Sequence, residues 1–256
     1  MPRPTWRRVK SFAIPPFPMK ALNFLSPHVG WLCLIILGFG DALAAEPSTG
    51  EPKTLMTERG TLLLKDDFNE TLDKDWKVIA PVWETVDGVL KATHTPPFAT
   101  NHGPVLQRTL AMKSVIVQVE IKLEGKAHAV LHFNKANGHL CRALLTPEAF
   151  YVIRRDSGAD KGTRLDTSES PIAPSVWHVL LVELAGGEMV AALDGGKPLI
   201  GKRDDLDQDK TALLLEAGGG TAWFRNLRVW QALPNKNWEA TRATIEATKK
   251  PADPGK

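Results

Sequence analysis

Val115-Ile-Val-Gln-Val-Glu-Ile-Lys-Leu123 alternates between apolar and polar residues, the pattern of a β-strand that buries one face. Because successive side chains of a strand point to opposite faces, we expect the apolar residues to face a core. The polar residues of this strand are then expected to point outward, and they are Gln118, Glu120 and Lys122.

The next apolar run, Ala129-Val-Leu-His-Phe-Asn134, shows the same alternation and places His132 and Asn134 on its polar face. Arg142 lies in a third run and is expected to point the same way. If these strands are neighbours, one sheet face carries a polar patch that meets a ligand. An ordinary solvated sheet face is the alternative interpretation. The patch consists of Gln118, Glu120, His132, Asn134 and Arg142.

Short runs of this kind recur along most of the chain, with turn residues between them. Asp87-Gly88, Asn137-Gly138 and Asp194-Gly195 are typical of tight hairpins. Helical periodicity of any length is absent until the C-terminus. The pattern predicts an all-β protein, an antiparallel sandwich or barrel, with one domain over residues 56–233. The expected strands are 61–64, 83–86, 89–91, 115–123, 129–133, 139–145, 150–154, 177–184, 189–193, 210–215 and 222–229.

The N-terminus is typical of an export signal. Basic residues precede the apolar run Val29–Phe39, and Ala42-Leu-Ala44 follows as a small-x-small cleavage pattern. We therefore predict a signal peptide over residues 1–44, with Met19 as an alternative start, and a secreted or periplasmic protein. A retained membrane anchor is the alternative, but the run is shorter than the roughly 20 residues that span a bilayer.

The remaining ends are expected to lie outside the domain core. Residues 45–60 are rich in Pro, Gly, Thr and Glu and predict a linker. Residues 234–256 predict a short helix, capped by Asn237, followed by a disordered tail that Pro251 begins.

Composition excludes several classes of protein. The chain of 256 residues is 43% hydrophobic, which is too apolar for a disordered chain. Its net charge of +3 comes from the leader, which holds five basic residues and one acidic residue. The rest is slightly acidic, so we expect no nucleic-acid partner. Cys141 is the one cysteine after the leader, and a buried inert thiol is favoured over a nucleophile.

No cofactor or metal site is predicted. Asp205-Leu-Asp207-Gln-Asp209, with Glu216 further on, resembles a calcium loop, but Lys210 stands where the turn needs Gly. An acidic surface turn is the favoured interpretation, and a structural Ca²⁺ elsewhere stays open. The histidines lack the spacing of a zinc site, although His132 and His139 flank one hairpin and could approach each other.

Several segments resemble the bacterial 3-keto-disaccharide hydrolase-like domains, often called family 16-like glycoside hydrolases. These segments are Asp66-Asp-Phe68, Asp75-Trp76, Trp83–Leu90, Trp177-His178, Met189–Gly195 and Trp223-Phe-Arg-Asn-Leu-Arg-Val-Trp230. The resemblance covers residues 56–233 and implies a concanavalin A-like jelly roll. It also implies an exported protein whose partner is a carbohydrate. The short apolar run of the leader separately predicts no stable membrane anchor.

The catalytic motif of family 16 is missing. That motif, Glu-x-Asp-x-x-Glu, places two carboxylates about 5–5.5 Å apart. The nearest approach here is Glu120-Ile-Lys-Leu-Glu124, in which Lys122 replaces the Asp. We predict hydrolysis of a glycoside or 3-keto-disaccharide, with Glu120 as general acid/base and the other patch residues binding substrate. The alternatives are a non-catalytic glycan-binding or cell-surface module and a purely structural domain.

Overall fold

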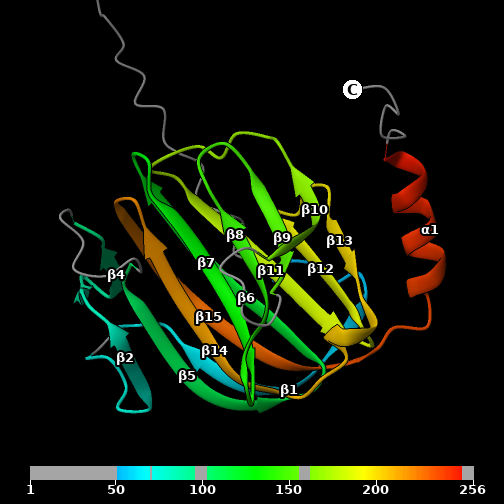
Figure 1. Cartoon of the computed structure of the whole chain (residues 1–256), viewed down its shortest axis with the longest axis horizontal. Helices are drawn as coiled ribbons and strands as arrows, with labels where there is room; N and C mark the ends of the chain where they lie inside the picture. The colour runs from blue at the N-terminus through cyan, green and yellow to red at the C-terminus, as the bar shows by residue number, and fades with distance from the viewer. Residues whose placement is uncertain (1–50, 70, 96–102, 156–161, 250–256) are drawn as a thin grey trace, which may run out of the picture. The chain divides into compact units, whose positions relative to one another are not determined.

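The computed structural model describes residues 51–249 except 70, 96–102 and 156–161 (Figure 1). The predicted signal peptide, its cleavage site and the tail after residue 249 therefore lie outside the described residues. Within them, two antiparallel β-sheets pack face to face, and one helix follows at the C-terminal end. The predicted all-β antiparallel sandwich with a short C-terminal helix is confirmed.

The first sheet, here called sheet A, has eight strands. β15 lies near its middle and pairs with β6 on one side; on the other side it pairs with β4 and, further along, with β1. In spatial order the strands are β13 (Leu199–Lys202), β12 (Glu188–Leu193), β11 (Trp177–Ala185), β6 (Val115–Glu124), β15 (Thr221–Pro234), β4 (Val89–Thr93) and β3 (Trp83–Val86), with β1 (Thr57–Asp66) beside β15.

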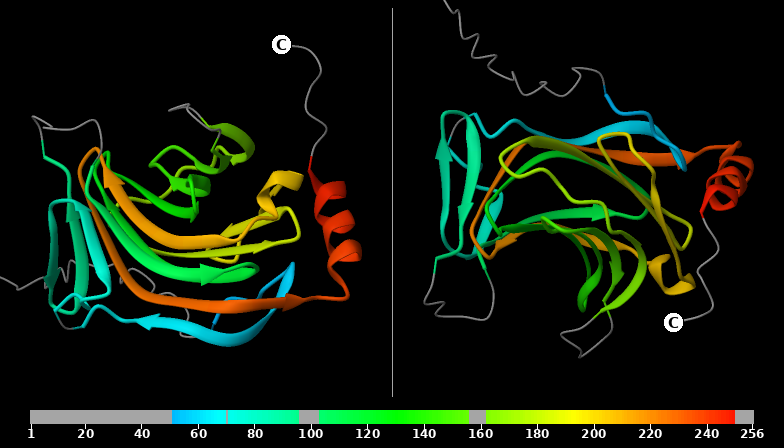
Figure 2. Two further views of the ribbon diagram at one scale, coloured as in Figure 1. Left: turned by 60° about the horizontal axis from the view of Figure 1, so that its bottom comes forward. Right: turned by 90° about the horizontal axis from the view of Figure 1, so that it is seen from above.

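The second sheet, sheet B, has seven strands, and each pairs in an antiparallel manner with its neighbours. In spatial order they are β10 (Thr163–Ser168), β9 (Phe150–Arg154), β8 (Gly138–Leu145), β7 (His128–Lys135), β14 (Lys210–Gly218), β5 (Val105–Met112) and β2 (Trp76–Ala80). Figure 2 shows that both sheets are curved, and that sheet B lies on the inner side of the curve.

The core lies between the two sheets and follows the alternation of the strands. Every second residue of β6 from Val115 to Leu123 is buried, and the polar residues between them are only partly exposed. β7 contributes Leu131 and Phe133 from the opposite sheet, and both are completely buried. Burying an aliphatic or aromatic side chain of this size stabilises a fold by about 1.5–3 kcal/mol.

The hairpins use the turn residues that the sequence indicates. Asp87 and Gly88 have φ of +50° and +73° between β3 and β4, the left-handed pair that a type I′ turn requires. Asp194 and Gly195 repeat this after β12, with φ of +53° and +65°. Asp and Gly are favoured at such positions because they tolerate positive φ better than other residues.

The first strand begins earlier than the predicted strand over residues 61–64. β1 begins at Thr57, inside the stretch expected to be linker. Glu183 explains this, because its buried carboxylate accepts hydrogen bonds from the backbone N–H groups of Leu55 and Thr57. Four strands were also not predicted, namely β2, β5, β10 and β13.

Helix α1 (Trp238–Thr248) packs on the outward face of sheet A at β12 and β13. Trp238 forms a small apolar cluster with Met56 and Val190, apart from the main core. The indole Nε1 donates to Glu188 Oε2 at 2.6 Å, and Arg242 also pairs with Glu188. The predicted C-terminal helix is thus fixed to the sandwich.

Candidate functional site

The predicted polar patch is divided between the two sheets. β6 belongs to sheet A, whereas β7 and β8 belong to sheet B, so Gln118 and Glu120 face away from His132, Asn134 and Arg142. The condition that these strands are neighbours, on which the single patch depended, is therefore not met. The short turn at Gly125, with φ of +60°, carries the chain from one sheet to the other instead of forming a hairpin within one sheet.

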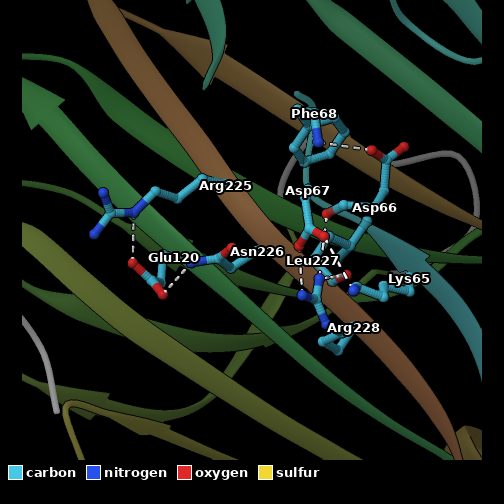
Figure 3. Close-up of polar contacts among 9 residues, drawn as sticks. All are labelled: Lys65, Asp66, Asp67, Phe68, Glu120, Arg225, Asn226, Leu227 and Arg228. Atoms are coloured by element: carbon cyan, nitrogen blue, oxygen red, sulfur yellow. Dashed lines mark hydrogen bonds and ion pairs between the residues drawn. The ribbon is translucent and has the colours of Figure 1, made fainter. Parts of the chain in front are cut away.

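Glu120 holds an irregularity in its neighbouring strand (Figure 3). Its carboxylate accepts hydrogen bonds from Arg225 Nε and Asn226 Nδ2, both at 2.6 Å. These donors begin a register shift in β15 that extends to Arg228, and Asn226 adopts a left-handed conformation with φ of +54°. A bulge disrupts the regular hydrogen-bond ladder between two strands. At this bulge the carboxylate of Glu120 is the partner of the Arg225 and Asn226 side chains.

Glu124 does not complete a catalytic pair with Glu120. Its carboxylate accepts a hydrogen bond from Trp223 Nε1 at 2.6 Å. The two glutamates are four residues apart on one strand, which corresponds to roughly 13 Å at the rise of a β-strand. A retaining glycosidase needs its two carboxyl groups about 5–5.5 Å apart. This geometry does not fit that mechanism.

Two segments that carry the family resemblance contact each other beside the Glu120 bulge. Asp67 follows β1 and pairs with Arg228 of β15, and Lys65 approaches the same carboxylate at 3.3 Å (Figure 3). Burial raises the pKa of Asp67, but its partners Arg228 and Lys65 outweigh burial and hold that pKa below the ordinary value. These contacts connect the first strand of the domain to the last.

His132 lies near the middle of sheet B, on the face that points away from the core. Its Nε2 lies 2.7 Å from Glu216 Oε2 on the adjacent strand β14. Arg142 stands directly opposite His132 on β8. His132 is only 2% exposed, although its side chain points away from the core between the sheets. The outward-facing apolar residues around it are equally buried, namely Val130, Ile153 and Leu214.

Further polar side chains extend this group along the same face. The ring of His139 lies 5.1 Å from that of His132, and His139 Nδ1 lies 2.8 Å from Asn134 Oδ1. His128 packs on Gly218, where a Cβ would come within 2.3 Å of the imidazole. The backbone N–H of Gly219 donates to His94 Nδ1. We call the group the His132 cluster, and its members are His94, His128, His132, Asn134, His139, Arg142 and Glu216.

Burial controls the protonation of this cluster. It lowers the pKa of His132 more than the bond to Glu216 raises it, and it lowers the pKa of His139 to about 4. Burial raises the pKa of Glu216, but the His132 hydrogen bond and the nearby positive charges outweigh it. At neutral pH the cluster therefore holds neutral histidines around one carboxylate. The hydrogen bond assigns the Nε2–H tautomer to His132.

Two residues near the middle of the cluster each have a buried atom without a hydrogen-bond partner among the described residues. These atoms are Nδ1 of His132 and Nε of Arg142. In the tautomer above, His132 Nδ1 is an acceptor, whereas Arg142 Nε is a donor. Buried polar atoms in folded proteins are nearly always satisfied, and those that are not call for an explanation such as a ligand. The sequence pattern found His132 and Arg142 but missed Glu216, His94 and His128.

The outward face of sheet A offers a second group of aromatic side chains. Trp177 and Trp223 flank Lys122 on adjacent strands, with Lys122 Nζ at 5.1 and 4.8 Å from the two ring centroids. Arg225 lies over Trp177 at 4.2 Å, and Lys91 lies near Trp223. The faces of both tryptophan rings therefore already contact Lys or Arg side chains of the domain itself.

Other chemistry considered from the sequence finds little support. Cys141 is completely buried, and burial raises the pKa of its thiol to about 12, as expected of an inert residue. Asp205 pairs with Arg154, whereas Glu216 pairs with His132. Two carboxylates of the apparent calcium loop are therefore each paired with a different residue. Among the described residues, no three His, Cys, Asp or Glu side chains converge in a way that could hold a metal ion.

Pockets also occur elsewhere on the domain. One of about 510 Å³ lies beside the β3–β4 hairpin, lined by Trp83, Leu72 and Asp87 among others. Its Glu84 already pairs with Lys91.

In the part of the chain that the structure describes, no helix is long and apolar enough to cross a membrane.

Comparison with known proteins identifies the fold. No family model matches the sequence, and no curated protein matches it. Solved structures do match. A protein of unknown function with a galectin-like fold from Bacillus subtilis has a TM-score of 0.56 and 14% identity, over 70% of this chain and 100% of that chain.

Two further matches have sugar-related names. The carbohydrate-binding module CBM66 from Bacillus subtilis has a TM-score of 0.51 and 14% identity, over 61% of this chain and 96% of that chain. A Bacillus licheniformis β-glucanase has a TM-score of 0.52 and 8% identity, over 68% of this chain and 99% of that chain. Identities this low show the jelly-roll fold, and they support the family resemblance for its fold alone.

Proposed function

We propose that this domain binds a carbohydrate on the outward face of sheet B, at the His132 cluster. The observation that carries the proposal is a polar face on the inner side of the curved sandwich. There, the acceptor His132 Nδ1 and the donor Arg142 Nε have no hydrogen-bond partner among the described residues. A sugar hydroxyl both donates and accepts, so it suits such a pair of atoms. Names of the structural neighbours, which include a carbohydrate-binding module and a glucanase, support the same class of ligand.

Sheet curvature favours this face over that of sheet A. Sheet B lies on the inner side of the curve, where an extended ligand contacts several strands at once (Figure 2). Asn134 and Glu216 add further polar atoms on neighbouring strands. Of the residues predicted to bind substrate, we therefore retain His132, Asn134 and Arg142. Gln118 lies on the other sheet and is not part of the proposed site.

Hydrolysis is the second candidate, and one contact favours it. Glu216 accepts from His132 Nε2 at 2.7 Å and leaves Nδ1 with a lone pair, an arrangement in which a carboxylate orients an imidazole base. Glu216 is the carboxylate that acts on His132 within the described ranges, so a mechanism with two carboxylates lacks support. Binding is therefore preferred, and Glu120 as general acid/base stays a prediction. Export to the periplasm or beyond, inferred from the leader, is part of the proposal.

The proposal is tested by titrating the purified domain with a panel of neutral and charged oligosaccharides by calorimetry. Asn134→Ala alters the proposed face, and Gln118→Ala is the matched change on the outward face of sheet A. We expect Asn134→Ala to weaken binding at least fivefold and Gln118→Ala to leave it unchanged. Binding that is lost in Gln118→Ala but kept in Asn134→Ala would place the site on sheet A.

Turnover is measured on the same oligosaccharides and on 3-keto-glycosides, with His132→Gln and Glu216→Gln as variants. Binding without product release supports a binding module. Product release that both variants reduce by more than a hundredfold would instead make the His132–Glu216 pair catalytic.

A further inference from the structure

We propose that the sugar bound at the His132 cluster is negatively charged, and that its carboxylate pairs with Arg142. This inference rests on the proposed binding site and adds the chemical class of its ligand. It begins from Arg142, which is half-buried on β8 and forms no hydrogen bond or ion pair with any described residue.

An arginine in this position calls for an anion. Transferring a guanidinium away from water is costly unless a carboxylate or similar group compensates for the lost solvent. Burial is the largest influence on the pKa of Arg142, which it lowers, and Arg155 lowers it further. The planar fork of N–H groups on arginine matches a carboxylate better than it matches a single hydroxyl.

The nearby carboxylate of Glu216 attracts Arg142 but forms no hydrogen bond with it. Its Oε2 lies 2.7 Å from His132 Nε2, and among the described residues no hydrogen bond joins Glu216 to Arg142. Arg155 contributes a second positive charge that influences both His132 and His139. Arg142 is therefore the guanidinium of the His132 cluster, and no carboxylate of the described residues bonds to it.

The remaining atoms suit a sugar rather than a simple anion. His132 Nδ1 is a buried acceptor directly across from Arg142, so a hydroxyl donor next to a carboxylate satisfies both residues. Hexuronic acids present this combination on one ring. A neutral sugar would satisfy His132 but would leave Arg142 without a carboxylate bonded to it.

The test compares hexuronate oligosaccharides of several linkages with their carboxyl-reduced counterparts, which have the same length and linkage but no charge. We expect at least one hexuronate to bind tenfold or more tightly than its reduced form in 0.1 M NaCl. The preference should shrink as salt rises, because salt screens charge pairs at a surface. Poly-glutamate serves as an anion without sugar, and sulfated oligosaccharides test a different anionic group.

Substitutions test whether Arg142 is the residue that causes the preference for the charged sugar. Arg142→Gln should abolish the preference for the charged sugar, so that the charged and the reduced form bind this variant within twofold of each other. Arg142→Lys retains the charge without the fork and should retain part of the preference. Lys122→Gln removes a similar charge from the outward face of sheet A and should change nothing.

The outcomes separate the inference from the proposed function. Equal binding of charged and reduced sugars, weakened by Asn134→Ala, would overturn the charged ligand but keep the sugar site. Equal binding of poly-glutamate would overturn recognition of a sugar, and a preference confined to sulfated ligands would overturn the carboxylate. Failure of every oligosaccharide to bind would overturn both proposals.

Discussion

His132 Nε2 and Glu216 Oε2 lie 2.7 Å apart on adjacent strands of sheet B, and this contact organises the outward face of that sheet. The bond fixes one nitrogen of the imidazole as a donor to the carboxylate. The other nitrogen is then an acceptor that no described residue uses. His132 lies on a strand that was predicted from its alternating apolar and polar residues. Glu216, to which it is hydrogen-bonded, was not among the predicted site residues.

The first prediction concerns stability in acid. The pKa of His139 is about 4 in the folded domain, because burial and the charges of His132 and Arg155 disfavour its protonated form. An unfolded histidine titrates near 6.5. The unfolded state therefore binds more protons between these values, and stability falls as pH drops from about 6.5 to 4. Because His139 is only partly withdrawn from solvent, screening reduces its share to about 1 kcal/mol.

This is measured by urea unfolding of wild type and His139→Asn between pH 7.5 and 4. The variant should be less sensitive to acid than wild type over that range. Identical pH profiles for the two proteins would show that His139 titrates normally in the folded state.

The second prediction concerns His178, whose pH dependence has the opposite sign. Its Nδ1 lies 2.6 Å from Asp194 Oδ2 and its Nε2 lies 2.9 Å from the carbonyl of Ala173, so both nitrogens face acceptors. The hydrogen bond to Asp194 raises the pKa of His178 despite burial. Its stabilising effect is complete below about pH 6.5 and is lost as pH rises through the raised pKa.

Asp194→Asn tests this pair with little change of shape, because asparagine tolerates the positive φ of this turn. We expect the substitution to cost about 1 kcal/mol at pH 5.5 and clearly less at pH 8.5, as measured by urea unfolding. An equal cost at both values would assign the effect to the hydrogen bond from Val179 N to Asp194 alone.

The sequence predicted the strands whose two faces differ. β6 and β7 were located because apolar and polar residues alternate in their sequences, although burial follows that alternation in β6 alone of the two. β10 contains Arg164 and Asp166, has no fully buried residue and lies at the edge of sheet B, so alternation gives no signal there. β2 and β13 are also edge strands, and β5 adjoins one of them.

The candidate site was predicted only in part, because alternation shows which residues point outward but not in which sheet they lie. His132 and Arg142 were correctly placed together, whereas Gln118 and Glu120 belong to the other sheet. Glu216 was missed because the run Leu213-Leu-Leu215 looked like the end of a strand. A strand continued to Gly218 would have placed Glu216 on the same face as Leu214, since alternate residues share a face.

The third prediction separates the structural and catalytic interpretations of Glu120. Glu120→Gln retains one oxygen for two donors, Arg225 Nε and Asn226 Nδ2, so one hydrogen bond at the β15 bulge is lost. We expect a loss of about 1–2 kcal/mol in urea unfolding and no change in sugar binding. A variant of unaltered stability that loses turnover would restore Glu120 as the general acid/base.

The fourth prediction concerns the attachment of α1 to sheet A. Trp238 is 8% exposed, packs on Met56 and Val190, and donates its indole N–H to Glu188. Trp238→Ala removes both the apolar contact and the donor, so we expect a loss of about 2–3 kcal/mol. Trp238→Phe removes the donor but keeps most of the ring, and should cost about 1 kcal/mol, since Arg242 and Lys202 still pair with Glu188.

Urea unfolding at pH 7 measures this series, with Glu246→Ala on the exposed side of the helix as the control. Because α1 covers β12 and β13 on sheet A, sugar binding on sheet B should be the same in all variants at a temperature where they are folded. If Trp238→Ala were as stable as the control, the helix would not contribute to the cooperative unit. Residues 57–234 would then form the smallest domain that folds alone, and a chain ending after Pro234 should show the same urea midpoint as the full domain.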